Sequence, residues 1–160
     1  MGMSRRQHHL TARSPKICIV ASCGGHLTEA LALSETYDAF EHFFVVNDKI
    51  ALPKQMEGKT HFIAHSERDL RLVVNLVEAV RILRNECPSL ILTTGAGPAV
   101  PFALFAKLFR IPVIYVEISA QVTSPSLTGR IMYYLADHFF FQWKPLQRFF
   151  PRGTYGGSLL

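Results

Sequence analysis

The sequence has little charge, little cysteine and no long apolar run, and each shortage excludes a class of protein. Charged residues make up 18% of the 160 residues and hydrophobic residues 49%, which excludes a disordered or collagen-like chain. Three widely spaced cysteines, Cys18, Cys23 and Cys87, exclude a disulfide framework and predict a reducing compartment. The uncharged stretch 90–106 contains two glycines and two prolines, so it predicts a strand, a loop and part of a helix rather than a membrane span. The apolar run 17–21 is too short for a secretory signal, so we expect a soluble or peripherally attached protein.

Positive charge is concentrated at the two ends of the chain. Residues 1–16 carry four bases and no acid, residues 17–106 carry seven bases and ten acids, and residues 107–160 carry six bases and two acids. A nucleic-acid-binding protein usually spreads Lys and Arg over one continuous face, so we expect no nucleic-acid partner. Two basic ends favour an anionic membrane surface or a phosphate-bearing substrate. We predict a basic flexible tail over 1–15 and a single domain over 16–160.

Short runs of β-branched residues alternate with helical segments along the rest of the chain. Strands are predicted over Lys16–Ala21, His42–Asn47, His61–Ala64, Leu90–Thr93, Pro112–Glu117 and His138–Gln142, and helices over Leu27–Tyr37, Ala99–Phe109 and Ser126–Ala136. This alternation predicts an α/β fold, a doubly wound Rossmann-like parallel sheet of about five or six strands. Ligands of such sheets bind at the carboxyl ends of the strands, so the loops that follow strands are the expected site.

The longest predicted helix begins after Ser66-Glu-Arg-Asp69, which is typical of an N-cap, and ends before Cys87-Pro88. Its periodicity predicts that Val74 and Val77 lie on the apolar face and that Asn75 lies on the polar face.

The first strand-end loop, Ser22-Cys-Gly-Gly-His26, opens the helix that follows it. Gly24 and Gly25 allow the backbone to approach a ligand, and a helix start favours an anion such as a phosphate. His26 can donate to a phosphate or act as a base. The alternative is a tight turn in which Ser22 caps the helix. Cys23 and His26 have no second pair that would complete a metal site, so we expect no metal.

Two further loops follow buried strands. Thr93-Thr-Gly-Ala-Gly-Pro98 contains Gly95 and Gly97, which permit positive φ or close approach, so it forms either a second wall of the same cleft or a packing turn. Glu117 ends a strand at the expected mouth and is a candidate general base; the alternative is a carboxylate that caps a helix or pairs with an arginine. The segment that follows offers hydroxyls, backbone donors and one cation at this mouth, from Ser126, Thr128, Gly129 and Arg130.

Aromatic residues beside basic ones mark the C-terminal region. Phe149 and Phe150 lie between Arg148 and Arg152, and they predict either an interface with a membrane or partner or simple core packing. The full set expected at such an interface is Arg5, Arg6, Trp143, Phe149, Phe150 and Arg152.

Taken together, these motifs resemble a known family. The segments that carry the resemblance are Ser22-Cys-Gly-Gly-His-Leu-Thr-Glu29, Thr94-Gly-Ala-Gly-Pro-Ala-Val-Pro101, Ile114-Tyr-Val-Glu117, Pro125-Ser-Leu-Thr-Gly-Arg130, Ala136-Asp137, Phe141-Gln-Trp143 and Gly156-Gly157. They resemble the PssD/CpsF-type subunits of bacterial capsule and exopolysaccharide glycosyltransferases. That family is similar to the membrane-side subunit of the eukaryotic enzyme that adds the second N-acetylglucosamine to dolichol-linked oligosaccharide, and more distantly to the N-terminal half of MurG.

The resemblance implies the acceptor-side half of a GT-B enzyme, whose donor-binding half is a separate partner chain. It implies inverting transfer of a sugar from a UDP-sugar, a co-substrate rather than a cofactor, to a polyprenyl-diphosphate-linked saccharide at the cytoplasmic face of the plasma membrane. His26 or Glu117 is the expected base, with Glu117 preferred because it ends a buried strand. The expected substrate-binding residues are Ser22, Gly24, Gly25, Glu29, Thr94, Gly95, Gly97, Ser126, Thr128, Gly129 and Arg130. The alternatives are a non-catalytic scaffold for a catalytic partner and a self-sufficient domain that binds a nucleotide alone.

Overall fold

The computed structural model describes residues 14–47, 53–63 and 71–159. Several sequence predictions lie outside these residues: the basic tail up to residue 13, with Arg5 and Arg6, the strand end at Ala64 and the helix start at Ser66–Asp69.

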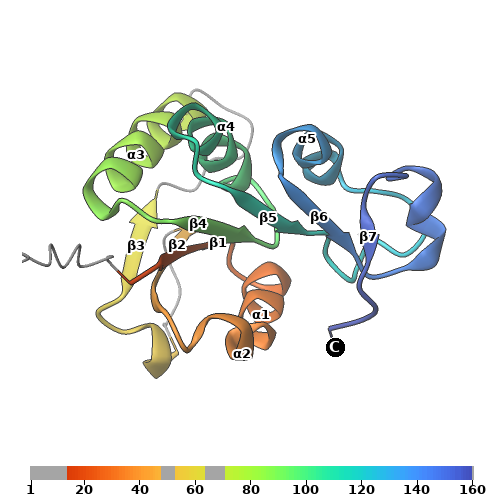
Figure 1. Ribbon diagram of the computed structural model, residues 1–160, viewed down its shortest axis with the longest axis horizontal. Coiled ribbons are helices and arrows are strands. Elements are labelled where there is room, and N and C mark those ends of the chain that lie inside the picture. Colours follow the sequence, from red (N-terminus) through yellow and green to blue (C-terminus); the bar gives the residue numbers. More distant parts are fainter. Residues whose placement is uncertain (1–13, 48–52, 64–70, 160) are drawn as a thin grey trace, which may run out of the picture.

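A parallel sheet of seven strands forms the centre of the molecule (Figure 1). The strands are β1 (Lys16–Ala21), β2 (Glu41–Asn47), β3 (Thr60–Ile63), β4 (Leu90–Thr93), β5 (Val113–Val116), β6 (His138–Phe141) and β7 (Thr154–Tyr155). Their order is β3-β2-β1-β4-β5-β6-β7, and every neighbouring pair is parallel. The doubly wound fold predicted from the sequence is therefore confirmed. The two-residue strand β7 extends the expected five or six strands, and it is too short to give a periodic signal.

Helices cover both faces of the sheet. Helices α3 (Arg71–Glu86), α4 (Ala99–Phe109) and α5 (Leu127–Leu135) lie on one face, and α1 (Gly25–Ala32) and α2 (Ser34–Tyr37) lie on the other (Figure 1). Short 3-10 turns occur at Lys54–Met56 and Lys144–Arg148. The single helix predicted over Leu27–Tyr37 is wrong, because the chain breaks at Leu33. There the Thr36 hydroxyl and backbone N–H both donate to the Leu33 carbonyl, at 2.6 and 2.9 Å, which starts a new turn.

Each face of the sheet has its own apolar core because side chains alternate along the strands. In β1, Cys18 and Val20 pack toward α3 and α4, and Ile17, Ile19 and Ala21 pack toward α1 and α2. This explains why β1 reads as a continuous apolar run in the sequence.

The faces predicted for helix α3 are wrong at Val74, Asn75 and Val77. Asn75 is 1% exposed, whereas Val74 is 47% and Val77 is 64% exposed. Within 74–86 the buried side chains are Asn75, Ala79, Ile82 and Leu83, which follow the spacing of a helix as regularly as the valines do. When a helix has two apolar stripes, the sequence alone does not show which of them faces the core. Here the stripe that contains the small Ala79 packs inward.

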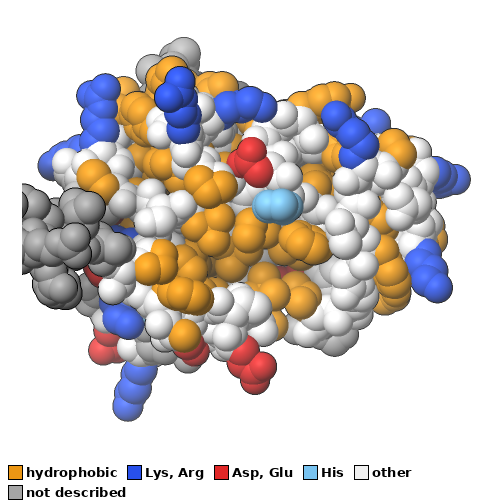
Figure 2. Space-filling model, in the orientation of Figure 1, with side chains coloured by type: hydrophobic (Ala, Val, Ile, Leu, Met, Phe, Trp, Pro, Cys, Tyr) orange, Lys and Arg blue, Asp and Glu red, His pale blue; other side chains and the backbone are white. Residues whose placement is uncertain are grey.

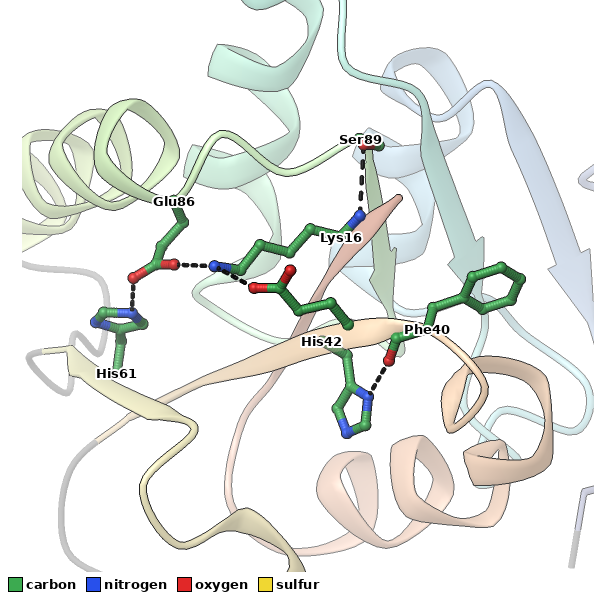
Figure 3. Close-up of polar contacts among 7 residues, drawn as sticks. Lys16, Phe40, His42, His61, Glu86 and Ser89 are labelled. Carbon is green, nitrogen blue, oxygen red and sulfur yellow. Dashed lines mark hydrogen bonds and ion pairs between the residues drawn. The ribbon is translucent and has the colours of Figure 1, made fainter. Parts of the chain in front are cut away.

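An ion-pair cluster joins the amino ends of three strands to the end of α3 (Figure 3). The Lys16 ammonium donates to Glu86 at 2.6 Å and pairs with Glu41 at 3.0 Å, and His61 Nε2 lies 2.9 Å from the other Glu86 oxygen. The hydrogen bond with Glu86 raises the pKa of Lys16, and the same bond lowers the pKa of Glu86. One of the four bases in the basic N-terminal region is therefore engaged within the fold.

Candidate functional site

The order of the strands identifies where a ligand site is expected. After β1 the chain moves outward to β2 and β3, and after β4 it moves in the opposite direction to β5, β6 and β7. In doubly wound sheets the crevice at this switch point, at the carboxyl ends of the strands, binds ligands. The loops after β1 and β4 meet here, and both were predicted from their glycines.

Two reciprocal hydrogen bonds join these loops. His26 Nδ1 lies 2.8 Å from the Thr94 carbonyl oxygen, and the Thr94 hydroxyl donates to the His26 carbonyl at 2.7 Å. A carbonyl oxygen only accepts, so Nδ1 carries the hydrogen of this contact. In the neutral ring, Nε2 then has the free lone pair and can take a proton.

The loop before α1 leaves backbone donors available at the helix start. Gly24 is the N-cap residue with φ +92°, so it has no side chain that could cap the helix, and the alternative in which Ser22 is the cap is not observed. Gly24 and Gly25 are exposed. The Cys23 N–H donates to Asn47 Oδ1 at 2.8 Å, which fixes the loop against the end of β2. An exposed helix start of this kind suits an anionic group.

The loop after β4 depends on a glycine at one position. Gly95 has φ +106°, and a Cβ atom there would lie 3.0 Å from the Tyr115 hydroxyl and 3.4 Å from the His26 ring. Ala96, with φ +69°, takes the second left-handed position, whereas Gly97 is exposed and does not have positive φ. Because Gly95 has no Cβ atom, the loop after β4 can lie directly against Tyr115 and His26.

Glu117 is turned into the protein. It is 0% exposed; its Oε2 accepts from the Tyr115 hydroxyl at 2.7 Å, and its Oε1 accepts from the Ser126 backbone N–H at 2.8 Å. Ser126 is the N-cap of α5, and its hydroxyl oxygen accepts from the Gly129 N–H at 2.7 Å. Burial and the neighbouring Glu117 raise the pKa of Tyr115, so its hydroxyl stays a donor. The carboxylate holds the start of α5, as the helix-capping alternative describes.

Several other predicted residues also have structural contacts. Glu29 is 1% exposed and points into the interior. Thr128 is half-buried and Arg130 is exposed. The Arg130 guanidinium lies 5.8 Å from the centre of the Phe149 ring. The structure thus brings His26, Thr94 and Gly95 together and keeps Glu29 and Glu117 away from solvent.

Of the described residues that were predicted at an interface, one is in the core and the others are half-buried or exposed. Phe150 is 2% exposed and packs on Phe139 with ring centres 4.4 Å apart, so the core alternative applies to it. Trp143 is half-buried and donates from Nε1 to the Ser119 carbonyl at 2.6 Å. Phe149 is half-buried against the Arg148 guanidinium, 4.7 Å from its ring centre, and Arg152 is exposed.

Sequence reasoning missed the polar partners of the buried carboxylates. Tyr115, Ser119 and Gln142 contact Glu117 or Glu29 directly. Their signal was a polar residue within or just after a strand that is otherwise apolar, which predicts burial but not the partner.

No group of three His, Cys, Asp or Glu side chains within 14–47, 53–63 and 71–159 is placed to hold a metal ion. No helix in the part of the chain that the structure describes is long and apolar enough to cross a membrane.

One known protein family and several named relatives match this sequence. A family model described as "Oligosaccharide biosynthesis protein Alg14 like" matches residues 69–159. Relatives named "UDP-N-acetylglucosamine transferase subunit ALG14" include a Mus musculus protein at 26% identity, covering 96% of this chain and 87% of the relative. The Saccharomyces cerevisiae protein of the same name is 33% identical over 56% of this chain and 42% of its own length.

Solved structures share the fold. MurG from Acinetobacter baumannii matches with a TM-score of 0.66 at 17% identity, over 82% of this chain and 42% of that chain. The UDP-N-acetylglucosamine 2-epimerase from Rickettsia bellii matches with a TM-score of 0.68 at 13% identity, over 86% and 41%. This chain spans about two-fifths of the length of these solved chains, and at such identities the likeness shows the fold alone.

Proposed function

The chain belongs to the Alg14-like family of oligosaccharide biosynthesis proteins, and from that premise we propose that it is the acceptor-side subunit of a two-chain glycosyltransferase. The donor is a UDP-sugar, for which the names of the relatives support UDP-N-acetylglucosamine. The acceptor is a saccharide on a polyprenyl diphosphate, in lipid-linked oligosaccharide synthesis or, following the resemblance to bacterial subunits, in exopolysaccharide or capsule synthesis. The observation that carries the proposal is the pairing of His26 with Thr94 at the switch point.

The geometry supports His26 as the base. As the acceptor hydroxyl oxygen attacks the anomeric carbon of the donor, its proton passes to His26 Nε2, the bond from that carbon to UDP breaks, and UDP leaves with the bonding electrons. The exposed start of α1 supplies backbone N–H groups for a phosphate of the acceptor. Glu117 has both carboxylate oxygens engaged and buried, which favours a supporting role over proton transfer.

An apolar hollow supports the need for a partner chain. It has a volume of about 350 Å³ and lies on the face of the sheet that α1 and α2 partly cover. Apolar side chains of β4, β5 and β6 form its floor, including Leu92, Ile114, Val116 and Phe140. Parallel sheets are normally covered on both faces, so a donor-binding chain seated here would complete the fold.

Reconstitution tests the proposed function. We expect the chain, co-expressed with a donor-binding GT-B subunit from the same genome, to elute with it in size-exclusion chromatography and to transfer sugar from UDP-N-acetylglucosamine to a polyprenyl-diphosphate-linked saccharide. Neither chain alone should turn over the donor. Transfer by the partner alone would identify the chain as a scaffold, and tight UDP-sugar binding by the isolated chain would identify a self-sufficient domain; both outcomes contradict the proposal.

We also propose that the outer helix surface, formed by α3, α4 and α5, contacts the membrane. Along this edge, apolar and basic side chains lie interspersed (Figure 2). Arg81, Arg84, Lys107 and Arg130 are exposed on these helices. The exposed large apolar side chains of the surface are Val74, Val77, Leu104, Leu108, Leu127, Ile131 and Tyr134. Apolar side chains beside cations suit an anionic lipid surface.

Vesicle binding checks this surface. We expect Val77→Glu and Leu108→Glu each to weaken binding to vesicles containing anionic phospholipid about tenfold, because each removes an apolar contact and adds repulsion. Added salt should weaken the binding of the unaltered chain. Val122→Glu is the matched control, since Val122 is 44% exposed but lies in the loop between β5 and α5 and not on one of these helices. Wild-type binding by both helix variants would contradict the proposed surface.

A further inference from the structure

Glu29 is a buried carboxylate that the proposed reaction does not use. It lies on α1, three residues after His26, and is 1% exposed. Its Oε1 accepts from the Ser119 backbone N–H at 2.9 Å and from the Ser119 hydroxyl at 2.6 Å. Its Oε2 accepts from Gln142 Nε2 at 2.6 Å. Both oxygens are therefore engaged by the protein, and a substrate cannot reach them without breaking these bonds.

The partners of Glu29 belong to two other strand-end segments. Ser119 follows β5, and its carbonyl accepts from Trp143 Nε1 at 2.6 Å. Gln142 follows β6, and its Nε2 also donates to the Glu117 carbonyl at 3.1 Å. Gln142 Oε1 accepts from the Leu159 N–H at 2.8 Å, and both residues line the apolar hollow. One side chain thus joins α1 to the ends of β5 and β6 and, through Gln142, to the surface proposed for the partner.

The chemistry of this network favours a role in alignment over a role in stability. Burying a carboxylate is costly, and no Lys or Arg in the described part of the chain forms an ion pair with Glu29. Three hydrogen bonds from neutral donors compensate the burial, and each has a fixed direction. A network of this kind tolerates little displacement of the elements that it joins.

We propose that Glu29 is a positioning residue that aligns helix α1, and with it His26, against the segment after β5. This inference rests on the proposed function. It replaces the expectation that Glu29 binds substrate. Displacing the start of α1 by even a fraction of an ångström would move His26 Nε2 relative to the acceptor hydroxyl, and proton transfer is sensitive to such displacement.

Hydrogen–deuterium exchange on the isolated chain tests the alignment without any activity. In Glu29→Gln one carboxylate oxygen becomes an NH₂ group, which must face either the two Ser119 donors or the Gln142 amide donor. In both orientations a donor faces a donor, so at least one of the hydrogen bonds is lost. We expect faster exchange in peptides covering 25–32 and 118–129, with β1 and β4 unchanged. Glu35→Gln is the matched control, because Glu35 is exposed on neighbouring α2, and its exchange should match wild type.

A second substitution separates the specific contact from general damage. When Gln142→Glu is added to Glu29→Gln, one oxygen of the carboxylate at position 142 can accept from the new amide. Its other oxygen can still accept from the Leu159 N–H. We expect the double variant to recover most of the lost protection, although the bond to the Glu117 carbonyl stays missing. No recovery, with both single variants folded, would overturn the assigned contact.

Kinetics of the reconstituted pair complete the test. Glu29→Gln should lower kcat roughly tenfold to a hundredfold and leave KM for the UDP-sugar unchanged, because the donor binds the partner chain. Unchanged kcat despite faster exchange, or a raised acceptor KM at unchanged kcat, would overturn the positioning role. If the wild-type pair transfers no sugar, the proposed function fails, and the exchange experiment still reports on the alignment by itself.

Discussion

Replacing His26 with asparagine is expected to reduce transfer by the reconstituted pair about 10²- to 10⁴-fold, the usual contribution of a positioned general base. Asparagine places an amide nitrogen near the position of Nδ1, so it can keep the hydrogen bond to the Thr94 carbonyl. It has no counterpart of Nε2. The variant therefore removes the proton acceptor while the join between the loops after β1 and β4 is kept.

His42→Asn is the matched control for this variant. His42 also places Nδ1 against a carbonyl, 2.9 Å from that of Phe40, but it lies in β2 near the amino ends of the strands. We expect this control to elute with the partner and to retain activity. Near-normal transfer by folded His26→Asn would exclude His26 as the base.

Glu117→Gln separates the two candidate bases. A glutamine at this position can still accept from the Ser126 N–H, and its NH₂ group can donate to the Tyr115 hydroxyl oxygen after that hydroxyl rotates. We therefore expect this variant to keep most of the transfer activity that His26→Asn loses. Loss of activity by folded Glu117→Gln, with His26→Asn active, would reverse the assignment.

The fold could be predicted from local signals where one physical cause dominates. The apolar run of β1 is buried on both faces, and the predicted bounds Lys16–Ala21 match the structure. The helix bounds of α4, Ala99–Phe109, also match. The signals fail where two causes compete. The break at Leu33 depends on Thr36 turning back to its carbonyl, and the inward face of α3 depends on which of two apolar stripes fits the sheet.

For the candidate site, the meeting of the two glycine loops could be predicted, but the contacts of each side chain could not. Glycines follow β1 and β4 at the switch point, where the two loops lie against each other. The burial of Glu117 could not be predicted, since it depends on Tyr115, two residues earlier in the chain, and on Gly129 in the first turn of α5. The same acid at the end of a strand serves equally well as a base in solvent or as a buried acceptor, and only the packing of α5 decides between them.

The packing of α5 on Glu117 leads to the second prediction of large effect, which concerns Gly129→Ala. Within a helix this change normally stabilises by up to about 1 kcal/mol. Here a Cβ atom on Gly129 would overlap the Glu117 carboxylate, which is held on two sides. We expect the variant to lower the free energy of unfolding by about 3 kcal/mol, as overpacking of a rigid site does. Urea unfolding followed by circular dichroism measures the change.

A double-variant cycle assigns this loss to the carboxylate. Glu117→Ala alone should destabilise the protein, because the Tyr115 hydroxyl and the Ser126 N–H lose their acceptor. Adding Gly129→Ala to it should cost little more, so the combined loss should be about 3 kcal/mol smaller than the sum of the two single losses. Gly25→Ala is the matched helix control, since a Cβ atom there would lie 3.5 Å from the Ile118 side chain, an ordinary contact. Wild-type stability of Gly129→Ala would mean that the carboxylate does not pack on α5, and Glu117 would then be free to turn toward the acceptor as the sequence suggests.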